Sequence, residues 1–273
     1  MTFLTKLAAA SRARDSIVCV GLDPEPGSIP EALGTGPQAA LRFLRRVIRA
    51  TSDYVCAYKP NLAFYERYGS AAFDILALTL QSIPDDIAVV LDAKRGDVPN
   101  TAEAYAEALF GSFHADAATV APYVGLDSIA PFCRDGRFAL VLARTSNPGA
   151  RDFQDAQVDG RPLYEHVVER CVEAFPADAC GFVVGATYPH EARRLRALAP
   201  DRFFLMPGVG SQGGDAQSSV TAALDARGGG ILLSSSRSVL YASKGHDFDQ
   251  AAARAARELR DAANAARAAV AGR

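Results

Sequence analysis

A chain of 273 residues with 49% hydrophobic and 22% charged residues can bury a sizeable core, and its net charge of −2 gives no overall field that would attract nucleic acid or an acidic membrane. No stretch approaches the roughly 18 consecutive apolar residues of a membrane span. The N-terminal segment is interrupted by Lys6, Arg12 and Arg14, so a short amphipathic helix is expected there rather than a signal peptide.

Eight short apolar runs, rich in β-branched residues, alternate along the chain with Ala-, Arg- and Glu-rich stretches of helical period. The expected strands are 16–23, 54–60, 87–94, 117–123, 138–145, 180–187, 203–210 and 230–236. The expected helices are 38–50, 66–81, 101–113, 126–134, 162–175, 189–199, 215–226 and 248–270. Strands that are apolar over most of their length are typical of a parallel sheet buried on both faces.

This alternation predicts an α/β fold, and eight strand–helix pairs within about 250 residues fit a closed (β/α)8 TIM barrel better than an open doubly wound sheet. Neither a Pro/Ser-rich linker nor a shift in composition divides the chain. Residues 1–273 are therefore expected to form a single barrel domain with a short N-terminal helix. An extended loop, 147–162, follows the fifth strand; loops of that length are often functional, for example as lids.

The cysteines and histidines lack the spacing of a metal site or of a disulfide framework. The cysteines are odd in number and lie mostly in apolar stretches, so we expect buried free thiols in a reducing cytoplasm: Cys19, Cys56, Cys133, Cys171 and Cys180. The four histidines are far apart in the sequence. No metal site is therefore predicted, and the expected location is the cytoplasm.

Polar and charged residues gather where the expected strands end, which is where a barrel of this type places its chemistry. The strand ends read Gly21-Leu22-Asp23-Pro24, Lys59-Pro60-Asn61, Asp92-Ala93-Lys94, Thr145-Ser146-Asn147, "PGVGSQGGD" (207–215) and "SSSRS" (234–238). The bodies of the same strands are apolar. This arrangement predicts a polar site at the carboxyl ends of the strands.

The densest group of charges follows the third strand, in "VVLDAKRGDVPNT" (89–101). Asp92 and Lys94 are two residues apart and so share one face of a strand, and Asp97 adds a second carboxylate just beyond it. Only four of the 29 basic residues are lysines. In a chain this rich in arginine, a lysine at this position indicates a role in which the amine gives up a proton, because a guanidinium does not readily do so. A solvated cluster of ion pairs is the alternative.

Two features indicate a phosphate site. Four glycines in "PGVGSQGGD" allow backbone N–H groups to approach an anion, and a helix is expected to start near Asp215. Arg237 lies at the end of the eighth strand, and the loops after strands seven and eight are the usual phosphate site of this fold. A phosphorylated small substrate is therefore expected.

The third-strand segment "LDAKRGDVPNTAEAY" resembles the D-x-K-R-x-D-(I/V)-x-x-T signature of the orotidine 5′-phosphate decarboxylase family. The segments "VGLDP", "YKPN", "TSNPG", "PGVGSQGGD" and "SSSRSVLYAS" resemble the other conserved blocks of that family, in the same order. The length and the last three segments are most similar to its longer bacterial branch (type 2). The resemblance implies a cofactor-free carboxy-lyase that converts orotidine 5′-monophosphate to uridine 5′-monophosphate and carbon dioxide, the final step of de novo pyrimidine biosynthesis.

The resemblance also implies roles for individual residues. Lys94 would protonate C6 of the pyrimidine, and Asp92 would lie beside the departing carboxylate. Asp97 would complete the charge network from the partner subunit of a homodimer, with Thr101 nearby. The implied substrate-binding residues are Asp23 and Lys59 at the ribose hydroxyls, Gln212 between pyrimidine and phosphate, Arg237 at the phosphate and Ser146 at the pyrimidine. No metal, nucleic acid or membrane partner is implied.

Other functions remain open from the sequence. A hexulose-6-phosphate synthase-like enzyme shares an Asp-x-Lys-x-x-Asp core but uses a divalent metal and acts on sugar phosphates. An aldolase that forms a Schiff base through Lys94 is another possibility. A nucleotide-binding barrel without activity is the third, although a binder has no evident need for the Asp-Lys-Asp set.

Overall fold

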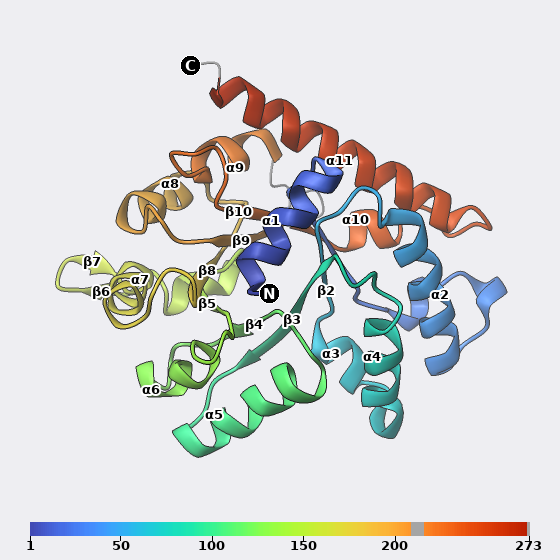
Figure 1. Cartoon of the computed structure of the whole chain (residues 1–273), viewed down its shortest axis with the longest axis horizontal. Coiled ribbons are helices and arrows are strands. Elements are labelled where there is room, and N and C mark those ends of the chain that lie inside the picture. The colour runs from blue at the N-terminus through green and yellow to red at the C-terminus, as the bar shows by residue number, and fades with distance from the viewer. Residues whose placement is uncertain (209–215, 272–273) are drawn as a thin grey trace.

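The computed structural model describes residues 1–208 and 216–271, and its centre is a closed barrel of parallel strands (Figure 1). In barrel order the strands are β1 (Val18–Gly21), β10 (Ile231–Ser235), β9 (Phe204–Pro207), β8 (Cys180–Val184), β5 (Ala139–Arg144), β4 (Ala117–Val120), β3 (Ala88–Arg95) and β2 (Ala57–Lys59). All the expected strands are present, and the barrel closes because β1 pairs with both β10 and β2. The predicted (β/α)8 barrel is confirmed.

Helices surround the barrel on its outer face (Figure 1). They are α2 (Gly36–Thr51), α3 (Leu62–Glu66), α4 (Ala72–Leu80), α5 (Pro99–Ala106), α6 (Leu126–Ile129), α7 (Leu163–Ala174), α8 (Pro189–Leu198), α9 (Ala216–Ala223), α10 (Arg237–Leu240) and α11 (Phe248–Ala271). The short helix α10, directly after β10, was not predicted from the sequence. It matters for the site because its first residue is the arginine expected to bind phosphate.

Two helices begin or break at residues with strong backbone preferences. The helix expected at 66–81 starts earlier, at Leu62, and is interrupted at Gly69, whose φ of +61° is a conformation that glycine adopts without strain. The helix expected at 101–113 starts at Pro99, because proline favours the first turn of a helix. These differences move the helix ends without changing the order of elements.

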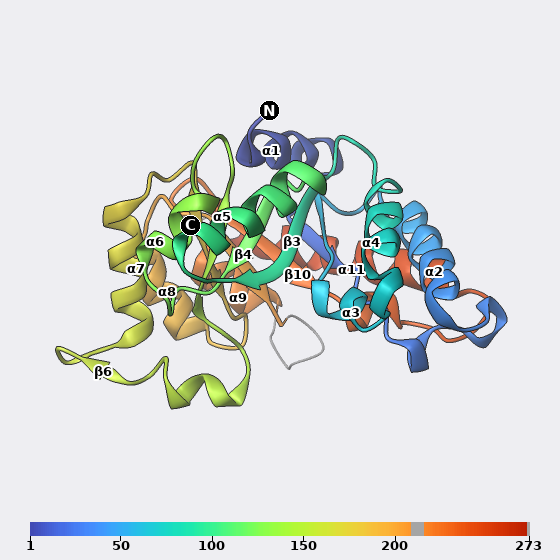
Figure 2. The ribbon, with the colours of Figure 1, turned by 90° about the horizontal axis from the view of Figure 1, so that it is seen from below.

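The predicted N-terminal helix, α1 (Phe3–Arg14), closes one end of the barrel. Figure 2 shows it at the end opposite to β6, the first strand of the hairpin described below. Its buried side chains Phe3, Leu7 and Ala10 belong to one apolar cluster with residues from the strands, and the rings of Phe3 and Phe138 are 4.8 Å apart. The barrel interior at this end is therefore filled with apolar side chains.

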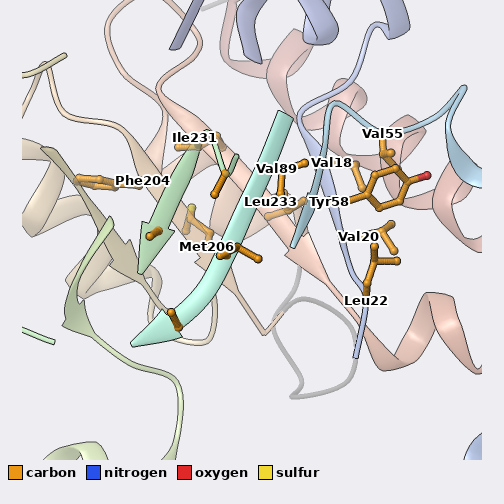
Figure 3. Close-up of a cluster of buried hydrophobic side chains, with 14 of the residues drawn as sticks. Val18, Val20, Leu22, Val55, Tyr58, Val89, Phe204, Met206, Ile231 and Leu233 are labelled. Carbon is orange, nitrogen blue, oxygen red and sulfur yellow. The ribbon is translucent and has the colours of Figure 1, made fainter. Parts of the chain in front are cut away.

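Buried side chains alternate along the strands between two clusters. Val18, Val20 and Leu22 face outward into the layer between strands and helices, together with Tyr58 (Figure 3). The inner cluster contains strand residues of the opposite parity, including Cys19, Ala57, Ala88, Val90, Ala117, Leu140, Leu205 and Leu232. This alternation is the period of two expected for strands. Positions 59, 92 and 119 continue the inner series toward the carboxyl ends of β2, β3 and β4.

The expected extended loop, 147–162, is confirmed and has structure of its own. It contains a 3-10 turn at Pro148–Asp152 and a small antiparallel hairpin of β6 (Gln157–Val158) and β7 (Arg161–Pro162). In Figure 2 the hairpin projects from the end of the barrel opposite α1. The insertion therefore lies on the side of the molecule where the strands end.

The described residues also test three smaller expectations. The five cysteines are free and buried, as predicted. None of the described helices is long and apolar enough to cross a membrane. Within residues 1–208 and 216–271, no three or more His, Cys, Asp or Glu side chains are grouped so that they could hold a metal ion.

Candidate active site

The carboxylate of Asp92, whose side chain is only 11% exposed, binds two lysines at the open end of the barrel. Lys59 Nζ, from the end of β2, donates to Asp92 Oδ2 at 2.9 Å. Lys94 Nζ, from the end of β3, donates to Asp92 Oδ1 at 2.6 Å. The two strands are parallel neighbours in the barrel, so their carboxyl ends meet at one edge. The predicted pairing of Asp92 with Lys94 is confirmed, and Lys59 joins the same group.

Thr119, on β4, is a third partner of this carboxylate that the sequence reasoning missed. Its hydroxyl donates to Asp92 Oδ1 at 2.8 Å and accepts from the backbone N–H of Lys94 at 2.9 Å. The signal was available, because Thr119 is a polar residue two positions after Ala117 on the inner face of an otherwise apolar strand. It fixes both the acid and the backbone of the lysine.

The charges of Asp92 and Lys59 stabilise each other. Burial alone would raise the pKa of Asp92, but the ammonium groups of Lys59 and Lys94 outweigh it and hold that pKa well below its usual range. Burial alone would lower the pKa of Lys59, but the carboxylates of Asp92 and Asp23 outweigh it and raise that pKa above its usual value. Both groups are therefore charged at neutral pH, and Lys59 holds its proton firmly.

Lys94 differs from Lys59 in its backbone and its exposure. Its φ is +47°, and the pairing of β3 with β4 shifts register between Leu91 and Arg95. Its side chain is 48% exposed, against 6% for Lys59. Regular strand alternation predicted only that Lys94 would share a face with Asp92. The irregularity additionally places its ammonium at the mouth of the barrel, in reach of solvent or a ligand.

Asp23 and Arg237 lie next to Lys59, at the ends of the neighbouring strands β1 and β10. Asp23 is 8% exposed, and its Oδ1 accepts from Asn61 N at 3.1 Å. Both line a cavity of about 280 Å³ that also includes Lys59, Phe64, Pro207 and Ser234. Arg237 is exposed at the start of α10. Of the residues predicted to bind substrate, the cavity thus brings together Asp23, Lys59 and Arg237. Gln212, the expected bridge between base and phosphate, lies outside the described residues.

Close backbone contacts hold the rim of this cavity. A Cβ atom on Gly21 would lie 1.8 Å from Ser236 Oγ, so only glycine lets the ends of β1 and β10 approach this closely. Tyr241 Oη donates to the carbonyl of Asp23 at 2.8 Å and accepts from the N–H of Glu25 at 2.7 Å. The loop after β1 is therefore attached to the segment that follows α10.

Asp97, Thr101 and Ser146 lie apart from the ion pairs. Asp97 is half-buried, and its Oδ1 accepts from its neighbour Val98 N at 2.7 Å. Among the described residues of this one chain, the ion pairs of Lys59 and Lys94 are with Asp92 and not with Asp97. Thr101 lies in the first turns of α5, and half-buried Ser146 follows β5.

Comparison with known proteins gives the family. A model described as "Orotidine 5'-phosphate decarboxylase / HUMPS family" matches residues 16–256, which is most of the chain. The chain belongs to this family. The family expected from the sequence motifs is thereby confirmed.

Relatives of this family match over nearly their whole lengths. Orotidine 5′-phosphate decarboxylase of Azoarcus sp. is 45% identical over 270 residues, which are 98% of this chain and 100% of the relative. The Cupriavidus necator protein of the same name is 45% identical over 269 residues, 97% of this chain and 98% of that one. The solved structure of Leishmania donovani OMP decarboxylase is 38% identical, with a TM-score of 0.85 and coverage of 98% of this chain and 99% of that one.

We predict that Asp92→Asn lowers the free energy of unfolding at pH 7 by about 3 kcal/mol, because it leaves the buried Lys59 ammonium without its nearest counter-charge. Urea titration measures this change. Asp86→Asn is the matched control: Asp86 is exposed and pairs with Arg14 at the surface, so its loss should cost at most about 1 kcal/mol. Equal stability of Asp92→Asn and wild type would contradict the prediction.

The effect of Asp92→Asn should depend on pH. The folded-state pKa of Asp92 is lowered, so its contribution is present above the pKa of an unfolded aspartate, near 3.9, and is lost as the pH falls toward the folded value. The difference in unfolding free energy between wild type and variant should therefore shrink below about pH 4. Urea titrations at several pH values would show whether it does.

Proposed function

We propose that this chain is an orotidine 5′-phosphate decarboxylase, which converts orotidine 5′-monophosphate to uridine 5′-monophosphate and carbon dioxide in the last step of de novo pyrimidine biosynthesis. One observation carries the proposal: the ammonium of the half-exposed Lys94 lies 2.6 Å from one oxygen of the largely buried Asp92 carboxylate, whose other oxygen accepts from Lys59. Membership of the family and the names of its close relatives support the same reaction.

The proposed chemistry needs a fixed cation beside C6 of the pyrimidine. When the bond between C6 and the carboxylate breaks, carbon dioxide leaves and the electron pair stays on an sp² carbon with little resonance stabilisation. The Lys94 ammonium meets this charge without having to reorganise, and then donates a proton to C6. Asp92 keeps the amine in position. Since about half of the Lys94 side chain is exposed, solvent can return the proton after the product leaves.

Lys59 is unsuited to the same role. Its side chain is buried, and the charges of Asp92 and Asp23 raise its pKa. We assign Lys59 and Asp23 to the ribose hydroxyls and Arg237 to the phosphate, since all three line one cavity beside the charge cluster. Gln212 is assigned to the pyrimidine and phosphate, and Ser146 to the pyrimidine, from the family resemblance. The proposed mechanism uses no metal and no cofactor.

The proposed active unit is a homodimer in which Asp97 and Thr101 reach the partner's Lys94. The position of Asp97 supports this, because neither Lys59 nor Lys94 of the same chain forms an ion pair with its carboxylate. Exposed apolar side chains also lie on the loops after the neighbouring strands β3 and β4, namely Val98, Tyr123 and Val124. Exposed apolar groups of this kind are typical of a surface that another protein covers.

The direct test is an assay of orotidylate absorbance with the purified protein in the presence of a chelator. Loss of the orotidylate band, with uridylate as the product, is the expected result. Turnover of a sugar phosphate that requires a divalent metal would instead favour the synthase-like reaction. Tight uridylate binding without any turnover would favour a binding protein.

Lys94→Ala should reduce kcat by at least about 10⁴-fold, because one group supplies both charge stabilisation and the proton. Uridylate should still bind, as calorimetry can measure. Lys244→Ala is the matched control, since Lys244 is an exposed lysine away from the charge cluster and its loss should leave kcat unchanged. Near-normal kcat in Lys94→Ala would refute the proposed role.

Mixing two inactive variants should restore activity if the site is shared between subunits. Lys94→Ala and Asp97→Ala homodimers each lack one group in both sites, whereas a mixed dimer has one intact site and one that lacks both. After unfolding and refolding together, an equal mixture should recover about a quarter of the wild-type activity, since half of the dimers are mixed and each has one working site. If each variant refolds alone and mixed dimers form without activity, Asp97 does not act across the interface.

Arg237→Ala should raise KM for orotidylate by about 10- to 100-fold, the effect of losing charged hydrogen bonds to phosphate. The variant should also discriminate less between orotidylate and the nucleoside orotidine than wild type does. Arg227→Ala is the control, because that arginine is 86% exposed on the loop before β10. An unchanged preference for the phosphorylated substrate would show that Arg237 does not contact phosphate.

A further inference from the structure

The insertion 147–162 is attached to the end of β5 through one side chain. The amide of Gln154 contacts Thr145 twice: its Oε1 accepts from Thr145 N at 2.9 Å, and its Nε2 donates to Thr145 Oγ1 at 2.8 Å. Both polar atoms of the amide are thus used on the residue directly before Ser146. A side chain that satisfies one residue's N–H and hydroxyl together fixes both its position and its orientation.

The side chain of Gln154 also accepts a hydrogen bond from a buried arginine. The side chain of Arg144, the last residue of β5, is 2% exposed, and its Nη1 donates to Gln154 Oε1 at 3.3 Å. Its guanidinium carbon lies 4.5 Å from the centre of the Tyr188 ring, and its Nη2 is 3.4 Å from the carboxylate of Asp155. A buried guanidinium needs such partners, so moving the insertion away would leave its charge uncompensated.

Backbone contacts hold the same part of the insertion to α7. Tyr164 N donates to the carbonyl of Gln154 at 3.2 Å, and Leu163 N donates to the carbonyl of Ala156 at 2.8 Å. Gln154 is therefore held through its main chain as well as its side chain. These attachments lie in the middle of the insertion, which suits a fixed support better than a lid that closes as one body.

Ser146 lies between this support and β8. A Cβ atom on Gly185 would lie 3.0 Å from Ser146 N and 3.1 Å from its Cα, so the backbone of Ser146 packs directly on that glycine. On its other side Ser146 follows Thr145, which Gln154 binds. We propose that Gln154 is a positioning residue: through Thr145 it fixes the position of Ser146 next to the pyrimidine. The insertion 147–162 thereby stabilises the part of the site that binds the base. This inference rests on the proposed function.

Gln154→Leu tests this positioning role, because leucine fills a similar space without making either hydrogen bond to Thr145. The affinities of uridylate and of ribose 5-phosphate are measured by calorimetry. Uridylate should bind about tenfold more weakly than to wild type, while ribose 5-phosphate, which has no base, should bind equally well. A general structural defect would weaken both ligands. Gln157→Leu is the matched control, since the exposed side chain of Gln157 donates to Asp155 O within the same insertion and has no bond to Thr145, so its loss should alter neither affinity.

Gln154→Glu should restore the contact. Its carboxylate can still accept from the N–H of Thr145 and lies beside the Arg144 guanidinium, and it can take the hydroxyl proton that Thr145 otherwise donates to Asn147 Oδ1, so uridylate affinity should be within about twofold of wild type. If Gln154→Leu does not fold, Thr145→Val removes one of the two bonds, and the same pair of affinities decides. The inference is overturned if the loss of the bonds leaves uridylate affinity unchanged, or if Gln154→Glu is as weak as Gln154→Leu. Orotidylate turnover by wild type, measured alongside, separates this failure from failure of the proposed function.

Discussion

The site depends on one carboxylate, Asp92, that binds two ammonium groups of unequal freedom. Lys59 is buried between Asp92 and Asp23, and these two acids raise its pKa, so it is a permanent positive charge. Lys94 uses the other oxygen of Asp92 and keeps half of its side chain in solvent. The buried lysine thus neutralises the acid that positions the exposed one. Of the two amines, only Lys94 combines a fixed position with access to an outside proton source.

The barrel supplies the geometry that this arrangement needs. Parallel neighbouring strands bring Lys59, Asp92 and Thr119 together at the carboxyl ends of β2, β3 and β4, while α1 fills the other end with apolar side chains. A regular β3 would place Lys94 on the same face as Asp92, two residues nearer the carboxyl end of the strand. The irregularity after Leu91, together with the bond from Lys94 N to Thr119 Oγ1, instead directs it to the mouth. The barrel therefore holds the charges, and a local departure from strand geometry presents one of them.

Much of this could be read from the sequence, and the exceptions have a common cause. The strands, their order and the meeting of Asp92 with Lys94 follow from the period of two and from the rule that parallel strands end at one edge. The positive φ of Lys94 belongs to a local strand irregularity. The bond of Thr119 to Asp92 and the attachment of Gln154 to Thr145 are side-chain contacts between different elements of the fold. Periodicity could place Thr119 on the inner face of β4, but it carries no information about which atoms these residues contact. The interruption of the helix at Gly69 could have been predicted, since glycine is unfavourable in the interior of a helix.

The two sides of the opening are held by different forces. On β2 and β3 the fixed groups are charged, and Lys59 and Asp92 are buried enough that solvent screens their interaction little. Between β5 and the insertion, neutral amide and hydroxyl groups make the contacts to Thr145, although a buried guanidinium lies beneath them. Acid would therefore weaken the first side through Asp92 well before it altered the bonds of Gln154, which has no titratable group. The charged cluster around Asp92 and the surface proposed to hold the base are thus held in place by separate contacts.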